Sequence, residues 1–184
     1  MTALDFFGRW RVRLGYLLGV ILLFLAHPTP RSLLWGGGVG FWGLALRAAA
    51  AGHLHKQEIL TVTGPYAHTR NPLYLGSFLL GAGAAVAMHS GWCALLLVVY
   101  FTLVYGFVMR REEDELREKH GATFELYAAA VPLFLPRLRP WRSAESPAGG
   151  FSWTQYRKNR EYQAAVGYCL LLVALFLLAY LRSA

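Results

Sequence analysis

Charged side chains are missing from long parts of this 184-residue chain, most completely between Asn71 and Met109, where 39 consecutive residues include no Asp, Glu, Lys or Arg. Hydrophobic residues make up 56% of the sequence, whereas an ordinary soluble domain has about 45–50%. A soluble domain also needs polar residues on the outer side of its elements. The composition therefore argues against an ordinary soluble fold and favours a protein that lies in a bilayer.

Cysteine is scarce as well. Cys93 and Cys169 are the only two, and both fall inside apolar segments, so we expect small core residues and no disulfide framework. His53 and His55 stand two positions apart, but no cysteine or carboxylate stands at ligand spacing from them. This pattern favours an interfacial loop, and we expect no metal site.

Segments of membrane-spanning length remain when the chain is divided at its charged residues. The uncharged block is about twice the length of one span, and HSGW (His89–Trp92) at its middle predicts a tight turn between two helices. We therefore expect an all-α integral membrane protein with about five transmembrane helices. The expected spans are Leu14–Pro30, Ser32–Gly52, Leu73–Met88, Trp92–Met109 and Tyr162–Leu181.

Acidic residues number 10 against 18 Lys and Arg, for a net charge of +8. With a cytoplasmic N-terminus, fifteen of these basic residues face the cytoplasm, only Arg31 and Arg182 lie outside, and Arg47 lies near the cytoplasmic end of a span, where it can snorkel. The positive charge thus predicts membrane orientation and contact with anionic lipids, and no nucleic-acid partner.

One glycine motif resembles a nucleotide-binding fingerprint. GVGFWG (Gly38–Gly43) matches G-x-G-x-x-G, but that fingerprint needs a preceding strand, and here it lies within an expected span. Gly36 and Gly40 stand at G-x-x-x-G spacing, which allows close helix approach. We interpret these glycines as packing residues, together with Gly76, Gly81, Gly83 and Ala87 of the third span.

Two polar clusters flank the expected hairpin of the third and fourth spans. GPYAHTRNPLYLG (Gly64–Gly76) precedes it, and a charged segment that starts at Arg110 follows it. A helical hairpin returns its ends to one side of the membrane, so we expect Gly64–Gly76 and Arg110–Tyr127 to meet at the cytoplasmic interface. Within the second cluster, the spacing predicts an ion pair between Glu113 and Arg117 on a solvated helix face.

These segments carry a resemblance to a known family. GPYAHTRNPLYLG, the hairpin, and EEDELREKHGATFELYAAAVPLFLP (Glu112–Pro136) resemble the C-terminal core of the isoprenylcysteine carboxyl methyltransferase and phospholipid N-methyltransferase group of membrane proteins. The family pattern is G-x-Y, then R-H-P-x-Y-x-G, then E-E and F-G-x-x-Y-x-x-Y-x-x-x-V-P-x-x-x-P. The likeness covers roughly Glu58–Pro136, and two ordered motifs are more specific than either alone.

The resemblance implies S-adenosylmethionine in a cytoplasm-facing pocket and a lipophilic acceptor from the bilayer, such as a prenylcysteine-type carboxylate or a lipid amine. Arg70 and Arg111 would line the substrate side as catalytic residues. The implied cofactor contacts are Glu58, Ile59, Leu60, Thr61, Tyr66, Asn71, Pro72, Leu73, Tyr74, Glu112 and Glu113.

The chain departs from the family pattern at three positions. Asn71 stands where the family usually has His, His120 replaces Phe, and Phe124 replaces the first Tyr. Asparagine forms hydrogen bonds but does not titrate, so it could not replace a histidine base.

Adjacent glutamates on a helix point about 100° apart, so we expect only one of them to face the pocket. Glu112 shares an otherwise apolar stripe with Tyr105, Val108 and Leu116, whereas Glu113 lies beside Arg117. The pattern predicts that Glu112 binds the cofactor and that Glu113 contributes little.

The sequence divides into a methyltransferase core at residues 1–140, with its motifs at 58–136, and an appendage at residues 141–184. The appendage comprises a linker, an interfacial basic-aromatic helix and the last transmembrane helix. It either anchors the last helix, or it covers the pocket or steers substrate. Two other functions stay open: a membrane lipid or sterol reductase that binds NADPH through Arg70, Arg110 and Arg111, and a non-catalytic membrane scaffold.

Overall fold

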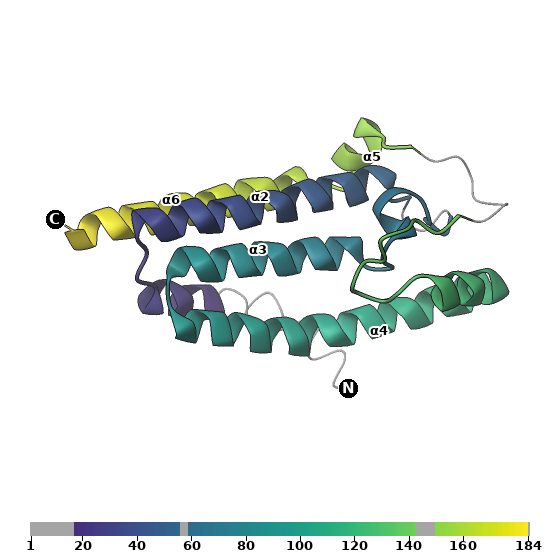
Figure 1. The fold of residues 1–184 in the computed structure, drawn as a ribbon, viewed down its shortest axis with the longest axis horizontal. Helices are drawn as coiled ribbons and strands as arrows, with labels where there is room; N and C mark the ends of the chain where they lie inside the picture. Colours follow the sequence, from purple (N-terminus) through teal and green to yellow (C-terminus); the bar gives the residue numbers. More distant parts are fainter. Residues whose placement is uncertain (1–16, 56–58, 143–149, 184) are drawn as a thin grey trace.

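The computed structural model describes residues 17–55, 59–142 and 150–183. Helices α2, α3, α4 and α6 lie side by side along the long axis, with α3 between α2 and α4 (Figure 1). Within the described ranges every regular element is helical, which confirms the predicted all-α class. The elements are a helix at 17–25, α2 (Pro30–His53), the 3₁₀ helix η1 (Gly64–Ala67), α3 (Pro72–Met88), α4 (Gly91–Ala130), α5 (Trp153–Lys158) and α6 (Tyr162–Ser183).

Two of these helices, α4 and α6, are long and apolar enough to cross a bilayer, and α3 is apolar but shorter, with 17 residues. Large apolar side chains on the outer face of α4 are exposed from Trp92 to Phe107, and the charged residues begin at Arg110. Exposed apolar surface of this extent marks a lipid-facing side. These features point to a membrane protein.

Most predicted helix bounds agree with the structure. The turn between α3 and α4 is tight, because His89 adopts a left-handed conformation with φ of 50°. The first expected span was too long at its C-terminal end: helix ends at Leu25, and α2 begins at Pro30 with a capping box between Thr29 and Ser32. Helix α4 continues 21 residues beyond the predicted end at Met109.

Glycines bring α2 and α3 into backbone contact. A Cβ atom added at Gly36 would lie 2.5 Å from the carbonyl oxygen of Gly83, and one added at Gly43 would lie 2.9 Å from that of Gly76. The packing interpretation is therefore confirmed for Gly36 and Gly43, and also for Gly40, where an added Cβ would meet the Tyr168 ring. It was wrong for Gly38 and Gly81, where an added Cβ would meet nothing within 4 Å.

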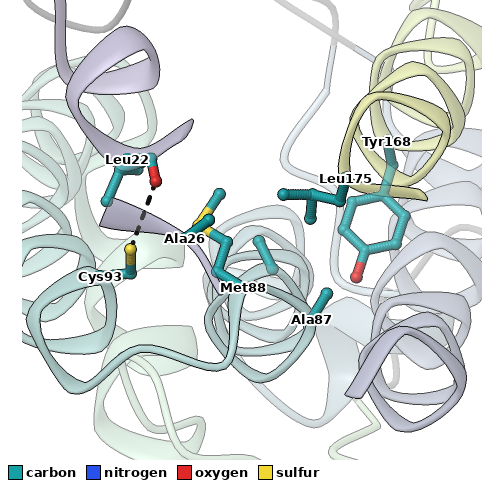
Figure 2. Packing of buried hydrophobic residues seen from close by; sticks show 8 residues of the cluster. Leu22, Ala26, Ala87, Met88, Cys93, Tyr168 and Leu175 are labelled. Atoms are coloured by element: carbon teal, nitrogen blue, oxygen red, sulfur yellow. Dashed lines mark hydrogen bonds between the residues drawn. The ribbon is translucent and has the colours of Figure 1, made fainter. Parts of the chain in front are cut away.

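The buried apolar residues form two separate clusters. The first joins the helix at 17–25 to α3, α4 and α6, and in Figure 2 Met88 and Cys93 lie below Leu22 while Leu175 and Tyr168 approach from α6. The second consists of Val62, Phe124, Tyr127 and Val131. It fixes the loop after α2 against the end of α4, which is where the two motif segments of the sequence come together.

Helix α4 bends at Gly121, whose φ of 50° and ψ of −126° are non-helical. This backbone region suits glycine, because a Cβ atom would clash with the backbone there. The bend turns the last part of α4 so that Phe124 and Tyr127, which are 1% and 2% exposed, are buried in the second cluster. Phenylalanine at position 124 therefore sits in an apolar site that needs no hydroxyl group.

We expect Gly121→Ala to lower the free energy of unfolding by about 2 kcal/mol, because alanine would have to adopt this strained conformation. Gly106→Ala is the matched control, since Gly106 lies in the same helix, is helical and also has open space around it. That change should leave stability equal or slightly higher. Detergent-solubilised variants can be compared by thermal unfolding, and equal melting temperatures would contradict the expectation.

Candidate functional site

The two polar clusters flanking the hairpin meet at one end of the bundle, as the sequence predicts. An ion pair joins Arg70 to Glu113, with Nη2 and Oε1 2.8 Å apart. The Tyr74 hydroxyl donates a 2.6 Å hydrogen bond to Glu112 Oε1. The Tyr127 hydroxyl donates to the carbonyl oxygen of residue 66 at 2.7 Å. The start of α3 and the charged part of α4 therefore form one constellation.

Both glutamates contact residues of the first polar cluster, but only one of them lies on the inner side, as expected, and it is Glu113 instead of Glu112. Glu113 lies on the inner side with 16% of its side chain exposed, whereas Glu112 is exposed. The sequence predicted that Glu112 faces inward, whereas the inward face of the helix carries the next residue, Glu113. The predicted pair of Glu113 with Arg117 was also wrong, because Arg117 bonds to Asp114 and Glu125 instead. Arg117 stands four residues after Glu113 on the same helix, but Glu113 pairs with Arg70, which precedes α3.

Arg70 is held from two sides. Its Nη1 donates to the carbonyl oxygen of Ala128 at 3.1 Å, and its Nη2 faces Glu113. Glu113 Oε1 is buried, and its described contact is the ion pair with Arg70 Nη2. Arg70 Nε is also buried, and it makes no hydrogen bond with the residues that the structure describes. A buried donor of this kind calls for a further partner, such as a bound ligand.

The backbone that follows α4 holds the segment that precedes α3 through hydrogen bonds. Pro132 accepts from the Arg70 amide, and Leu133 accepts from the Asn71 side-chain amide at 3.0 Å. Asn71 is only 7% exposed. At the position where the family usually has His, this chain thus uses an amide to hold α3 in place.

The Tyr66 phenol is buried, and this burial is the main reason why its pKa lies well above the ordinary value. Tyr127, Glu112, Glu161 and Tyr74 raise that pKa further, in this order. Tyr66 therefore keeps its proton at physiological pH. It can donate a hydrogen bond but cannot serve as an anionic base.

The other predicted cofactor residues surround this constellation unevenly. Leu60 packs against the second apolar cluster, and the Thr61 hydroxyl accepts from the amide of residue 55 at 3.2 Å. Ile59 is 48% exposed, and Pro72 is buried at the start of α3. The carbonyl oxygen of Leu73 accepts a hydrogen bond from Arg47 of α2. Glu58 lies outside the described residues.

Arg111 does not join the constellation through any described contact. Its Nε donates to Glu115 at 2.9 Å, and both side chains are more than half exposed. A catalytic role for Arg111 remains a prediction.

A hollow of about 650 Å³ lies on the other side of the braced segment. It is largely apolar, and it contains none of the predicted cofactor residues. Since the carboxylates and the buried polar atoms lie in the constellation, we place the polar chemistry there and regard the hollow as a neighbouring apolar space. Its lining consists of Leu46, Val62, Thr63, Gly64, Pro65, Ala67, His68, Thr69, Leu75, Pro136, Pro140, Trp141 and Arg142.

A second ion pair was missed from the sequence. Arg47 of α2 binds Glu161 through two contacts, Nε to Oε2 at 2.9 Å and Nη2 to Oε1 at 2.8 Å. Its Nη1 donates to the Leu73 carbonyl oxygen at 3.1 Å. The sequence did contain a signal for this pair, because a lone arginine inside an apolar span needs a partner. The sequence analysis explained Arg47 by snorkelling, which requires no partner, and therefore did not look for Glu161.

The sequence pattern of the phospholipid methyltransferase family matches residues 14–123 of this chain. That range is more than half of the chain and includes both polar clusters up to the bend at Gly121. The chain belongs to the phospholipid methyltransferase family. The resemblance noted in the motifs is thereby confirmed, and the family match extends it toward the N-terminus.

Two curated relatives of this family member carry names that refer to metal resistance. The nickel-cobalt-cadmium resistance protein NccN of Alcaligenes xylosoxydans xylosoxydans is 38% identical over 88 residues, which is 48% of this chain and 41% of NccN. The cobalt-zinc-cadmium resistance protein CzcN of Cupriavidus metallidurans is 29% identical over 163 residues, 80% of this chain and 68% of CzcN. The match to NccN thus spans less than half of that relative. No solved structure matches this chain.

Proposed function

We propose that this protein transfers a methyl group from S-adenosylmethionine to a lipophilic acceptor held in the bilayer. The main support for the proposal is that the two motif segments meet in a polar constellation at the end of apolar helices. Members of the phospholipid methyltransferase family generally use this donor. A site at this boundary can take a soluble donor from water and an acceptor from lipid.

The residues present fit such a donor. Glu112 is exposed and is oriented by Tyr74, so its carboxylate can accept hydrogen bonds from ribose hydroxyls or from the amino group of the methionine part. Arg70 Nε is a buried donor that lacks a hydrogen bond within the described residues, so a bound ligand could supply its acceptor. The adjoining apolar hollow lies within the size range of small-molecule sites, about 300–1,000 Å³.

When bound, S-adenosylmethionine supplies a sulfonium methyl group with a good leaving group. This chain then has to orient the two reactants in line and exclude water. Glu112 and Tyr74 would bind and orient the donor, and the Arg70–Glu113 pair would hold the start of α3 against α4. Tyr66 stays protonated and would contribute packing or a hydrogen bond. No nucleophilic side chain is required.

The proposed arrangement in the membrane has five spans, with the N-terminus and the constellation on the cytoplasmic side. Four spans would be α2, α3, the first part of α4, and α6. The fifth would include the helix at 17–25, whose nine described residues cover about half of a bilayer. The excess of basic residues on the constellation side and the exposed apolar outer faces support this arrangement.

The acceptor we favour is a lipid amine or a prenylcysteine-type carboxylate, because both combine a polar reacting group with an apolar tail. The contacts of the arginines support a methyltransferase over an NADPH-dependent reductase. Arg70 and Arg111 are each paired with a glutamate, so two of the three arginines considered for a phosphate site are already engaged by carboxylates.

Calorimetric titration of the purified protein with S-adenosylmethionine, and separately with NADPH, tests this function. Mass spectrometry of membrane extracts incubated with isotopically labelled S-adenosylmethionine would then identify the acceptor. Binding of NADPH alone would favour the reductase, and binding of neither compound would favour a scaffold.

We expect Glu112→Gln to weaken S-adenosylmethionine binding by about 1–3 kcal/mol, or about 5- to 150-fold, because the neutral amide loses charge-assisted hydrogen bonds. Tyr74 can still donate to the glutamine oxygen, so the local structure should persist. Asp114→Asn is the control, since Asp114 is an exposed carboxylate of the same helix that bonds to Arg117. Calorimetry should show unchanged affinity for the control, and equal losses in both variants would refute the assignment of Glu112.

A further inference from the structure

Arg47 is the only charged residue of α2 beyond its first turn, and its described contacts are with Glu161 and with the start of α3. Its guanidinium group binds Glu161 through two hydrogen bonds and donates from Nη1 to Leu73 O and to Ser77 Oγ. The two side chains are only 19% and 11% exposed. In a weakly hydrated site of this kind, a bidentate ion pair fixes the direction of the remaining donors.

The contacts on α3 lie in its first two turns, next to the residues of the constellation. Leu73 directly precedes Tyr74, which orients Glu112. The stem of Arg47 lies against Gly76, where an added Cβ atom would come within 2.4 Å of Arg47 Cγ. Arg47 thus occupies a defined groove on α3 and fixes the start of that helix from the side opposite α4.

Glu161 is itself held in place by the segment around α5. The Asn159 side-chain amide donates to the carbonyl oxygens of Ala51 at 2.9 Å and of Leu54 at 3.0 Å. The Phe151 ring covers Gly52, and the Ser152 amide donates to the Gly52 carbonyl oxygen. The C-terminal appendage is therefore attached to the end of α2, and it presents Glu161 to Arg47 from a fixed position.

We infer that Glu161 and Arg47 are positioning residues for methyl transfer, and that the C-terminal appendage is a working part of the site. The inference rests on the proposed function. Glu161 lies outside residues 14–123, the part of the chain that matches the family. Glu161, which lies beyond the family match, thus helps to position the first turn of α3, which carries Tyr74, by orienting Arg47.

A simpler role for the pair would be to attach α6 to α2. The two roles differ in what they require of position 47. Attachment needs only opposite charges at positions 47 and 161, in either order. Positioning needs donors at position 47, because the Leu73 carbonyl oxygen accepts a hydrogen bond from Arg47. Exchanging the two residues would restore the ion pair but would place a carboxylate against that carbonyl oxygen.

The test compares Glu161→Gln, the exchange variant R47E/E161R, and Tyr168→Phe in the full-length protein. Tyr168→Phe is the matched control, because it removes a hydrogen bond of 2.9 Å from α6 to the Gly36 carbonyl oxygen of α2, away from the constellation. Three quantities are measured: melting temperature, amide hydrogen exchange of residues 72–77, and the Kd for S-adenosylmethionine.

We expect Glu161→Gln to accelerate exchange at residues 72–77 and to raise the Kd about tenfold. The exchange variant should recover much of the melting temperature but neither the slow exchange nor the Kd. Tyr168→Phe should lower the melting temperature and leave the other two quantities within about twofold of the wild type.

Recovery of the Kd in the exchange variant, or an unchanged Kd in Glu161→Gln, would overturn the inference while leaving the proposed function intact. A wild-type protein that does not bind S-adenosylmethionine would overturn the proposed function. Hydrogen exchange, which needs no ligand, would then still decide whether the pair fixes the start of α3.

Discussion

Replacing Glu113 by glutamine should destabilise the protein by about 2–4 kcal/mol and remove most of the proposed methyl-transfer activity. The carboxylate neutralises Arg70, and both side chains are about five-sixths buried. With glutamine at this position, Arg70 would keep its charge in a poorly hydrated place with only neutral acceptors beside it, the amide oxygen and the Ala128 carbonyl oxygen. The start of α3 would then be held to α4 less firmly, although the Tyr74–Glu112 hydrogen bond would remain. Thermal unfolding and transfer of labelled methyl groups would measure the two effects.

Glu115→Gln is the control for this change, because it makes the same substitution two residues further along the helix. The pair of Glu115 with Arg111 is exposed, with 61% and 62% of the side chains accessible, and should contribute less than about 0.5 kcal/mol. If both variants unfold at the same temperature, the Arg70–Glu113 pair is not the link between α3 and α4. This expectation reverses the one from the sequence, which assigned Glu113 a minor role.

Gly36→Val should be at least as damaging, with a loss of about 3 kcal/mol or more in the free energy of unfolding. An added Cβ atom at this position would lie 2.5 Å from the Gly83 carbonyl oxygen and 2.6 Å from the Ala87 amide nitrogen. Both are backbone atoms of α3, so the two helices would have to separate. The separation would also move the α3 turn that carries Tyr74. Yield of folded protein and detergent-dependent unfolding report the loss.

Gly38→Val provides the comparison, since Gly38 lies in the same helix and an added Cβ atom would meet nothing within 4 Å. Its stability should match that of the wild type. The same variant tests the G-x-G-x-x-G pattern. A nucleotide-binding loop would be sensitive to valine at Gly38, whereas a packing helix is sensitive at Gly36, Gly40 and Gly43 and tolerates valine at Gly38. Damage from Gly38→Val alone would contradict the packing interpretation.

Hydropathy and glycine spacing were sufficient to predict the helices and much of their packing. Uncharged stretches predicted α3 and α6 closely, because a helix in a bilayer must be apolar along its whole length. The helical continuation of α4 beyond Met109 was also expected, but its bend was not. Past that point the helix is amphipathic and charged, and its bend depends on one glycine, Gly121, whose conformation no periodicity reveals.

The motifs predicted which two segments meet, but they did not predict the partners within them. A hairpin of known length returns its ends to one side, so the meeting of Arg70 and Tyr74 with the glutamates followed from connectivity. Which glutamate faces inward depends on a rotation of about 100°. The small contrast between neighbouring apolar stripes was too weak to determine that rotation.

The sequence by itself determined the class, the family motifs and the close packing of α2 on α3, because these depend on composition and on spacing along one helix. Only the tertiary structure decided that Glu113 pairs with Arg70 and that Glu161 pairs with Arg47, 114 residues away. The physical reason is that an ion pair depends on distances of about 3 Å between charged atoms. Such distances are set by the joint packing of several helices, and no local pattern in the chain contains them.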